Sequence, residues 1–310
     1  MKSSECKFTY PNTTAKGEPR AFVQLEELTT LWFNTGTRCN LECSSCYIES
    51  SPRNDRYVFL TSEDIHPFLQ EINSSTKIIG LTGGEPFLNP SIISILTKIL
   101  DTKREILILT NGHRVLNKYF EKLIALNKAY PDKLKIRVSL DHHTKEIHEE
   151  NRGERTFNST MESMKWLFDN NLDLSIAGRS LQNETLSDAI NSYQNLMIKW
   201  GINLNLDSGD SEKLIIFPEL KQNEDVPEIS MGCWEILNKR PQDQMCASQR
   251  MVVKLKETQQ MAVLPCTLLV YDKQFELGNT IRDSRKTVFL NHQFCSKFCV
   301  LGGATCSSAK

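Results

Sequence analysis

Strand-like and helix-like segments alternate along most of the chain, and this alternation limits the fold more than any other feature. Six apolar runs are expected to form strands, at residues 28–35, 77–83, 105–110, 133–140, 173–178 and 213–218. Five stretches with helical spacing of apolar residues lie between them, at 62–72, 90–100, 114–126, 157–170 and 186–200. Strands that alternate with helices form parallel β/α units. The sequence therefore predicts an α/β protein built on a parallel sheet.

The predicted units divide the chain into three parts. Residues 1–27 are expected to be a polar N-terminal leader, residues 28–220 the α/β domain, and residues 221–310 a C-terminal domain with six of the ten cysteines. Six units are two fewer than a closed (β/α)8 barrel contains. A partial barrel and an open doubly wound sheet have the same local pattern, so periodicity alone does not choose between them.

Charge and hydropathy exclude several classes of protein. The formal net charge is -1 and no lysine or arginine run is present, so neither nucleic acid nor an anionic membrane is an expected partner. The N-terminus lacks the apolar core of a signal peptide, and no later stretch is long and apolar enough to span a bilayer. The expected location is the cytoplasm, where thiols stay reduced. Ten cysteines there favour metal or cluster binding over disulfides.

The first expected strand is followed by three closely spaced cysteines, Cys39, Cys43 and Cys46, in the pattern CxxxCxxC. Three thiolates on one loop can bind three corners of a cubane 4Fe-4S cluster. A structural zinc would need a fourth cysteine or histidine, and the next cysteine in the chain is Cys233. A cluster with three protein ligands has one iron open to a small molecule. A zinc knuckle completed by a distant cysteine, or three buried thiols, are the alternatives.

Polar motifs end each of the next four expected strands. They are TGGEP at 82–86, TNG at 110–112, SLD at 139–141 with an NRG motif at 151–153, and SIAG at 175–178. Together with the cysteine loop, and in this order, they resemble the motifs of the radical S-adenosylmethionine (SAM) superfamily. The resemblance implies a partial (β/α)6 TIM-like barrel with its site at the carboxyl ends of the strands.

The resemblance also implies the cofactors and their ligands. Cys39, Cys43 and Cys46 would hold a SAM-binding 4Fe-4S cluster. The residues expected to contact SAM are Gly83, Gly84, Glu85, Asn111, Ser139, Arg152, Ile176 and Tyr47. The family usually has an aromatic residue before the third cysteine, whereas here Ser45 takes that position and Tyr47 follows the cysteine. Tyr47 either substitutes for that aromatic residue or packs under the loop.

The implied reaction begins with one electron, from a reducing partner such as a flavodoxin or ferredoxin. The reduced cluster cleaves SAM into methionine and a 5′-deoxyadenosyl radical, which takes a hydrogen atom from the substrate. The cofactors supply this chemistry, and the protein orients them and excludes water.

The C-terminal cysteines form a second group. Cys246 and Cys266 flank a predicted β-hairpin, and a close group of three cysteines follows it. The arrangement resembles the twitch or SPASM extension of radical SAM enzymes. It implies one auxiliary 4Fe-4S cluster held by Cys246, Cys266, Cys295 and either Cys299 or Cys306, with a structural zinc as the alternative. Cys233 is a buried thiol, a spare ligand or a hydrogen-atom donor to a substrate radical.

Three classes of function follow. The favoured prediction is a radical SAM enzyme acting on a small metabolite or natural-product intermediate. The alternative is a peptide- or protein-modifying enzyme, a maturase or epimerase. Such relatives often carry an N-terminal peptide-binding domain, and only about 27 residues precede the first strand here. The third is a non-catalytic metal-binding protein. The net reaction is left open, and Asp141, His142 and His143 at the barrel mouth are given no role.

Overall fold

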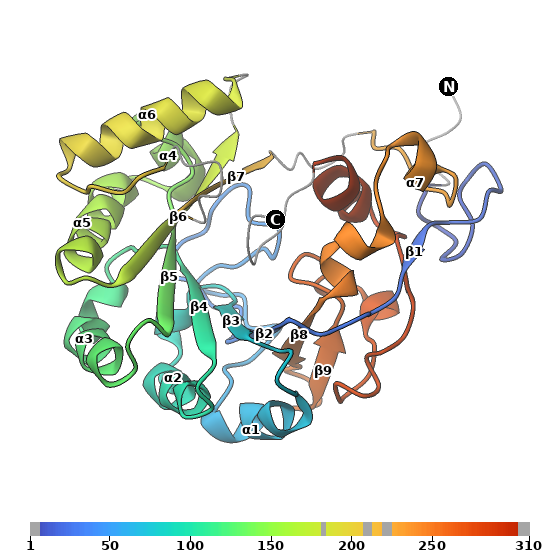
Figure 1. The fold of residues 1–310 in the computed structure, drawn as a ribbon, viewed down its shortest axis with the longest axis horizontal. Helices are drawn as coiled ribbons and strands as arrows, with labels where there is room; N and C mark the ends of the chain where they lie inside the picture. Colours follow the sequence, from blue (N-terminus) through green and yellow to red (C-terminus); the bar gives the residue numbers. More distant parts are fainter. Residues whose placement is uncertain (1–6, 181–183, 207–212, 219–224, 303–310) are drawn as a thin grey trace.

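The computed structural model describes residues 7–180, 184–206, 213–218 and 225–302 (Figure 1). Its main sheet has the strand order β7-β6-β5-β4-β3-β2-β8-β9. The six parallel strands expected from the sequence are all present, as β2 (Thr30–Asn34), β3 (Ile78–Thr82), β4 (Glu105–Thr110), β5 (Leu134–Ser139), β6 (Asp173–Ser180) and β7 (Leu214–Pro218). Neighbours along the chain are neighbours in the sheet, with helices along its outer side in Figure 1. A partial barrel, rather than a doubly wound sheet, is thereby confirmed.

The helices that cover the sheet match the expected stretches, with one addition. They are α1 (Ser62–Glu71), α2 (Ile92–Leu100), α3 (Phe120–Ala129), α5 (Thr156–Asp169) and α6 (Leu186–Lys199). The helix α4 (Lys145–Arg152) was not expected, because its sequence KEIHEENR has no apolar periodicity. It forms just after β5 and carries Arg152 in its last turn, so it belongs to the functional end of the barrel.

Burial on both faces keeps the barrel strands in place. All five residues of β2 are buried, and the inner side of α2 contributes Ile95, Leu96 and Ile99 to the same core. Burying each such side chain stabilises the fold by about 1.5–3 kcal/mol. The strands thus form a rigid base, and the loops at their carboxyl ends are free to carry polar residues.

The C-terminal segment continues the barrel sheet. The expected hairpin is present as β8 (Gln249–Lys254) and β9 (Met261–Leu264), and β8 pairs in parallel with β2. The short helix α7 (Cys233–Ile236) precedes the hairpin, and a π-helical turn, Cys295–Leu301, follows it. The hairpin and the six barrel strands therefore form one continuous sheet.

The described part of residues 1–27 packs on the C-terminal segment. The strand β1 (Phe22–Val23) pairs antiparallel with β10 (Val288–Phe289). The buried Arg20 side chain forms an ion pair with Glu228 at 2.6 Å. No helix in the described ranges is long and apolar enough to cross a membrane.

Candidate active site

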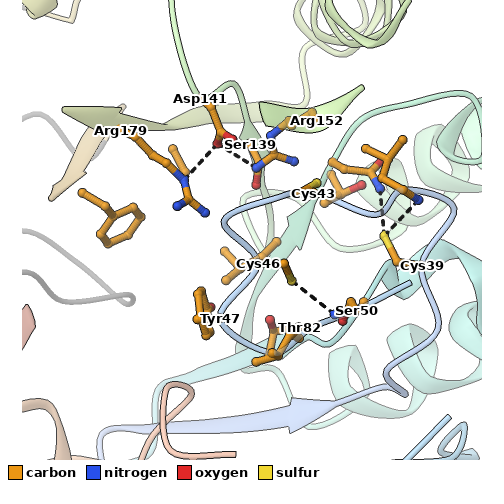
Figure 2. Close-up of a pocket in the computed structure, with 18 of the residues that line it drawn as sticks. Cys39, Cys43, Cys46, Tyr47, Ser50, Thr82, Ser139, Asp141, Arg152 and Arg179 are labelled. Carbon is orange, nitrogen blue, oxygen red and sulfur yellow. Dashed lines mark hydrogen bonds and ion pairs between the residues drawn. The ribbon is translucent and has the colours of Figure 1, made fainter. Parts of the chain in front are cut away.

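The loop after β2 brings three cysteine sulfurs to the carboxyl end of the barrel (Figure 2). Backbone N–H groups donate to two of them, from Leu41 to Cys39 Sγ at 3.4 Å and from Ser50 to Cys46 Sγ at 3.3 Å. Such contacts stabilise the thiolates that bind iron–sulfur clusters. Burial raises the pKa of Cys39 to about 12 and also raises that of Cys43, so both would need a nearby cation to ionise. The donor set therefore fits a metal cluster.

Gly83 and Gly84 allow the end of β3 to pack against the backbone of this loop. A Cβ atom on Gly84 would lie 2.1 Å from the Arg38 carbonyl oxygen, and one on Gly83 would lie 2.4 Å from the Gly36 oxygen. Gly83 also has a φ of +137°, which L side chains rarely adopt. The Gly84 N–H donates to the Gly36 oxygen at 2.8 Å. Both glycines line the cavity, and the cysteine loop packs so closely against them that neither position has room for a side chain.

Glu85 lies behind the cavity and braces the turn after β4. Its buried carboxylate accepts hydrogen bonds from Thr110 Oγ1 at 2.8 Å, from the Asn111 N–H at 2.9 Å and from the Phe87 N–H at 3.1 Å. Burial raises its pKa to about 7. Glu85 is absent from the cavity lining, so its contact with SAM stays a prediction while its contact with the Asn111 turn is observed.

Asn111 links the β4 turn to the cysteine loop. Its Nδ2 atom lies 2.9 Å from Asn40 Oδ1 and 3.6 Å from Cys39 Sγ. Asn111 and Ser139, the last residue of β5, both line the cavity. Two of the residues expected to contact SAM thus lie on the same cavity as the three cysteines.

Two arginines converge on Asp141 at the cavity wall, as Figure 2 shows. Asp141 Oδ1 lies 2.8 Å from Arg152 Nη2 and 3.3 Å from Arg179 Nε. Burial opposes ionisation of Asp141, but the two guanidinium groups outweigh it and lower the pKa of this carboxyl to about 2. Arg152 Nε is buried with no hydrogen-bond partner among the described residues. Arg152 therefore retains a donor that suits a ligand carboxylate.

Arg179, Phe217 and Phe298 are among the lining residues that were not expected from the sequence. Arg179 and Phe217 lie at the carboxyl ends of β6 and β7, so the strand-end rule that identified the other sites would have found them. Phe298, from the π-helical turn, stacks on Phe217 with ring centroids 5.5 Å apart. Nothing in the local sequence indicates this contact, because the two residues come from distant segments.

On β6 the cavity is lined by the neighbours of the expected residue. Ile176 is fully buried in the hydrophobic core, whereas Ala177 and Gly178 line the cavity. Successive side chains of a strand point to opposite faces, so Ala177 lies on the cavity side while Ile176 lies in the core, and the adenine contact expected of Ile176 stays a prediction. Tyr47 lines the cavity beside the cysteine loop.

Three C-terminal cysteines lie close together in a second buried cluster. Burial, together with the neighbouring Cys266, raises the pKa of Cys246 to about 12. The pKa of Cys295 is raised by burial and by both of these cysteines. Cys299 is half-buried on the same π-helical turn as Cys295. Cys306 lies outside the described residues.

Cys233 begins helix α7 and is half-buried. Its sulfur lies 3.6 Å from Ser230 Oγ, and it does not line the cavity. A hydrogen-atom donor would have to reach that cavity, so the observed contacts favour the packed thiol.

Comparison with known proteins identifies the class. The family model of the radical SAM superfamily matches residues 33–194, which include the cysteine loop, the strand-end motifs and most of the barrel. The chain belongs to the radical SAM superfamily, and it is a radical SAM enzyme. The expected family, the partial barrel with its C-terminal hairpin, and the implied SAM and 4Fe-4S chemistry agree with this result.

Individual relatives match this chain at low sequence identity. The antilisterial bacteriocin subtilosin biosynthesis protein AlbA of Bacillus subtilis (strain 168) is 26% identical over 275 residues, covering 83% of this chain and 58% of AlbA. The GTP 3′,8-cyclase of Pseudomonas fluorescens (strain Pf0-1) is 33% identical over 81 residues, 25% of this chain and 24% of that protein. The chain thus spans little more than half the length of AlbA and about a quarter of the cyclase.

Solved structures share the fold. The anSMEcpe structure with bound AdoMet and Cp18Cys peptide has a TM-score of 0.56 and 16% identity, covering 90% of this chain and 84% of that one. Streptococcus suis SuiB bound to S-adenosylmethionine has a TM-score of 0.57 and 14% identity, covering 79% and 62%. At these identities the likeness concerns the fold alone.

Proposed function

We propose that this radical SAM enzyme modifies a peptide or protein substrate. The observation that carries the proposal is the extent of the match to AlbA, a bacteriocin biosynthesis protein, which covers 83% of this chain. The match to GTP 3′,8-cyclase, named for a nucleotide substrate, covers only 25%. SuiB has been solved with its precursor peptide SuiA, and anSMEcpe with the Cp18Cys peptide. The comparisons therefore favour the peptide alternative over the small-metabolite prediction.

The cavity has a cofactor side on which cluster and SAM can lie together. Cys39, Cys43 and Cys46 would hold the cluster, while Gly83, Gly84, Asn111, Ser139 and Arg152 would hold SAM. Arg152 is suited to the methionyl carboxylate, because its buried Nε atom has no hydrogen-bond partner in the described part of the chain. When bound, the two cofactors supply a 5′-deoxyadenosyl radical, and the buried cavity excludes water from it.

The cavity wall that contains Phe217 and Phe298 connects the cavity to the C-terminal cysteines. Phe298 lines the cavity, and Cys295 and Cys299 flank it on the same π-helical turn. Residues four apart on such a turn share roughly one face. We therefore assign an auxiliary 4Fe-4S cluster to Cys246, Cys266, Cys295 and Cys299. This turn would place the auxiliary cluster beside a substrate bound against Phe217 and Phe298.

The test uses peptides encoded by short reading frames beside the gene. Each peptide is incubated anaerobically with the reconstituted enzyme, SAM and dithionite, and both peptide mass and 5′-deoxyadenosine are measured. We expect one peptide to lose hydrogen and, when deuterated, to transfer deuterium into 5′-deoxyadenosine. Neither change should occur with the Cys39→Ala/Cys43→Ala/Cys46→Ala variant.

A small-molecule donor of the hydrogen atom would overturn the proposal. If no peptide changes mass, while a deuterated small metabolite labels 5′-deoxyadenosine, the substrate is a small molecule. The assignment to the radical SAM superfamily would be unaffected, because SAM cleavage is measured separately in the same reaction.

A further inference from the structure

Two adjacent histidines and a glutamate converge outside the cavity described above. His142 and His143 follow β5, and Glu184 lies just before α6. His142 Nε2 is 3.3 Å from Glu184 Oε1, and His143 Nε2 is 3.1 Å from Glu184 Oε2. None of the three side chains lines the cavity. They form a separate cluster that joins two segments of the barrel, called here the His–His–Glu cluster.

The cluster is largely shielded from water. The exposed side-chain fractions are 4% for His142, 18% for His143 and 16% for Glu184. The two imidazole rings lie 4.0 Å apart, and all three donor atoms fall within 4.8 Å of one another. Two neighbouring histidines in extended backbone would point to opposite sides. The turn after β5 instead directs both toward one carboxylate.

Hydrogen bonds within the His–His–Glu cluster do not provide a partner for every buried polar atom. His143 Nε2 and Glu184 Oε2 form a hydrogen bond. Glu184 Oε1 is buried without a hydrogen-bond partner in the described ranges, although His142 Nε2 lies close to it. A buried, unsatisfied carboxylate oxygen is costly, so this atom indicates a missing partner.

The spacing of the donors suits a small divalent cation. Zinc bonds to histidine nitrogen and carboxylate oxygen of about 2.0–2.1 Å place neighbouring ligands of a tetrahedral site about 3.3 Å apart. The second nitrogen of His142, Nδ1, accepts a hydrogen bond from the Thr144 N–H at 3.0 Å and lies 2.8 Å from Thr144 Oγ1. A metal bound at Nε2 would require the ring proton on Nδ1, where the Thr144 hydroxyl oxygen can accept its hydrogen bond. Two histidines and one glutamate are an established ligand set for zinc.

We propose that His142, His143 and Glu184 bind one divalent first-row cation, for which Zn²⁺ is the best-fitting ion. The metal would fasten the loop after β5 to the beginning of α6, and its fourth position would remain open to water or another ligand. The proposal does not depend on the nature of the substrate, because none of the three residues belongs to the SAM cavity.

The experiment measures zinc in the cluster-loaded enzyme, so that cysteines already occupied by iron do not compete. Reconstituted protein is dialysed against chelator-buffered Zn²⁺, and zinc and iron are counted in the same sample. We expect one zinc per chain in the wild type at unchanged iron. His143→Ala and Glu184→Gln should each lose it, with at least a tenfold weaker zinc affinity.

Two matched variants serve as controls. His66→Ala removes a histidine of α1 that is hydrogen-bonded to Gln70, and Glu146→Gln removes an exposed glutamate of α4. Both should keep the zinc. Wild-type protein without zinc, or His143→Ala and Glu184→Gln proteins with full iron and undiminished zinc, would overturn the proposal. Because iron content reports folding, a misfolded variant is recognised and replaced by His143→Gln.

Discussion

At the residue scale, the burial of His148 is expected to make the free energy of unfolding depend on pH. It is fully buried on α4, it packs edge-on against Phe157 at 5.6 Å, and neither ring nitrogen has a hydrogen-bond partner in the described structure. Burial, assisted by the nearby Arg152, lowers the pKa of His148 to about 3. The side chain is therefore neutral in the folded protein at all physiological pH values.

This burial predicts sensitivity to acid. The unfolded chain binds a proton at His148 below about pH 6.5, whereas the folded chain does not until about pH 3. The free energy of unfolding should therefore fall as the pH drops through this window, by up to about 1.4 kcal/mol per pH unit from this residue. In urea unfolding at pH 7.5 and pH 5.0, the loss should be about 2 kcal/mol smaller for His148→Leu than for the wild type.

The control for this measurement is His66→Leu, because His66 lies near the surface of α1. Its unfolding should show the wild-type pH dependence. An equal loss of stability in His148→Leu and wild type would mean that His148 is protonated in the folded state.

At the scale of elements, the contact between the end of β3 and the cysteine loop has a specific consequence. The sequence predicts that Gly84 contacts SAM, and in the structure a Cβ at this position would point at the Arg38 carbonyl oxygen, 2.1 Å away. Gly84→Ala should therefore displace the cysteine loop and lower the iron bound there by at least half, together with SAM cleavage. Iron analysis after anaerobic reconstitution measures this effect.

Gly232→Ala is the matched substitution, since nothing lies within 4 Å of a Cβ at that position and its φ is -68°. It should keep its iron and its activity. Full iron in Gly84→Ala, combined with weakened SAM binding, would show that the glycine faces the cofactor instead.

The elements also show what the sequence can and cannot reveal. The six barrel strands were predicted nearly in full because they are continuous apolar runs, which in β2, β3 and β4 are buried on both faces. That same continuity hides which residues of β6 line the cavity, and these are Ala177, Gly178 and Arg179. Helix α4 was missed since charged residues dominate it. The pairing of β8 with β2 is a long-range contact, which no local pattern encodes.

For the whole molecule, the number of iron–sulfur clusters per chain tests whether the C-terminal cysteines hold a second cluster. Three cysteines are expected to hold the SAM-binding cluster, and Cys246, Cys266, Cys295 and Cys299 can supply one further four-thiolate site. Reconstituted protein should hold about eight irons per chain by the four-iron arithmetic of such clusters. The Cys39→Ala/Cys43→Ala/Cys46→Ala variant should retain about half of them.

A zinc count completes this prediction. About four irons in the wild type, with stoichiometric zinc that persists in His143→Ala, would identify the C-terminal site as a structural zinc site. The persistence matters because zinc bound to the His–His–Glu cluster would disappear in that variant. Cys233→Ser is the control, and it should change neither metal.

The parallel pairing of β8 with β2 also determines how the protein can be dissected. β2 lies between β3 and β8, and its five residues are all buried. A chain cut before Gln249 would expose one side of this apolar strand, with its unpaired N–H and C=O groups facing solvent. Such a strand is a template for aggregation. The barrel is thus not a detachable module, and single substitutions are the appropriate way to silence either end.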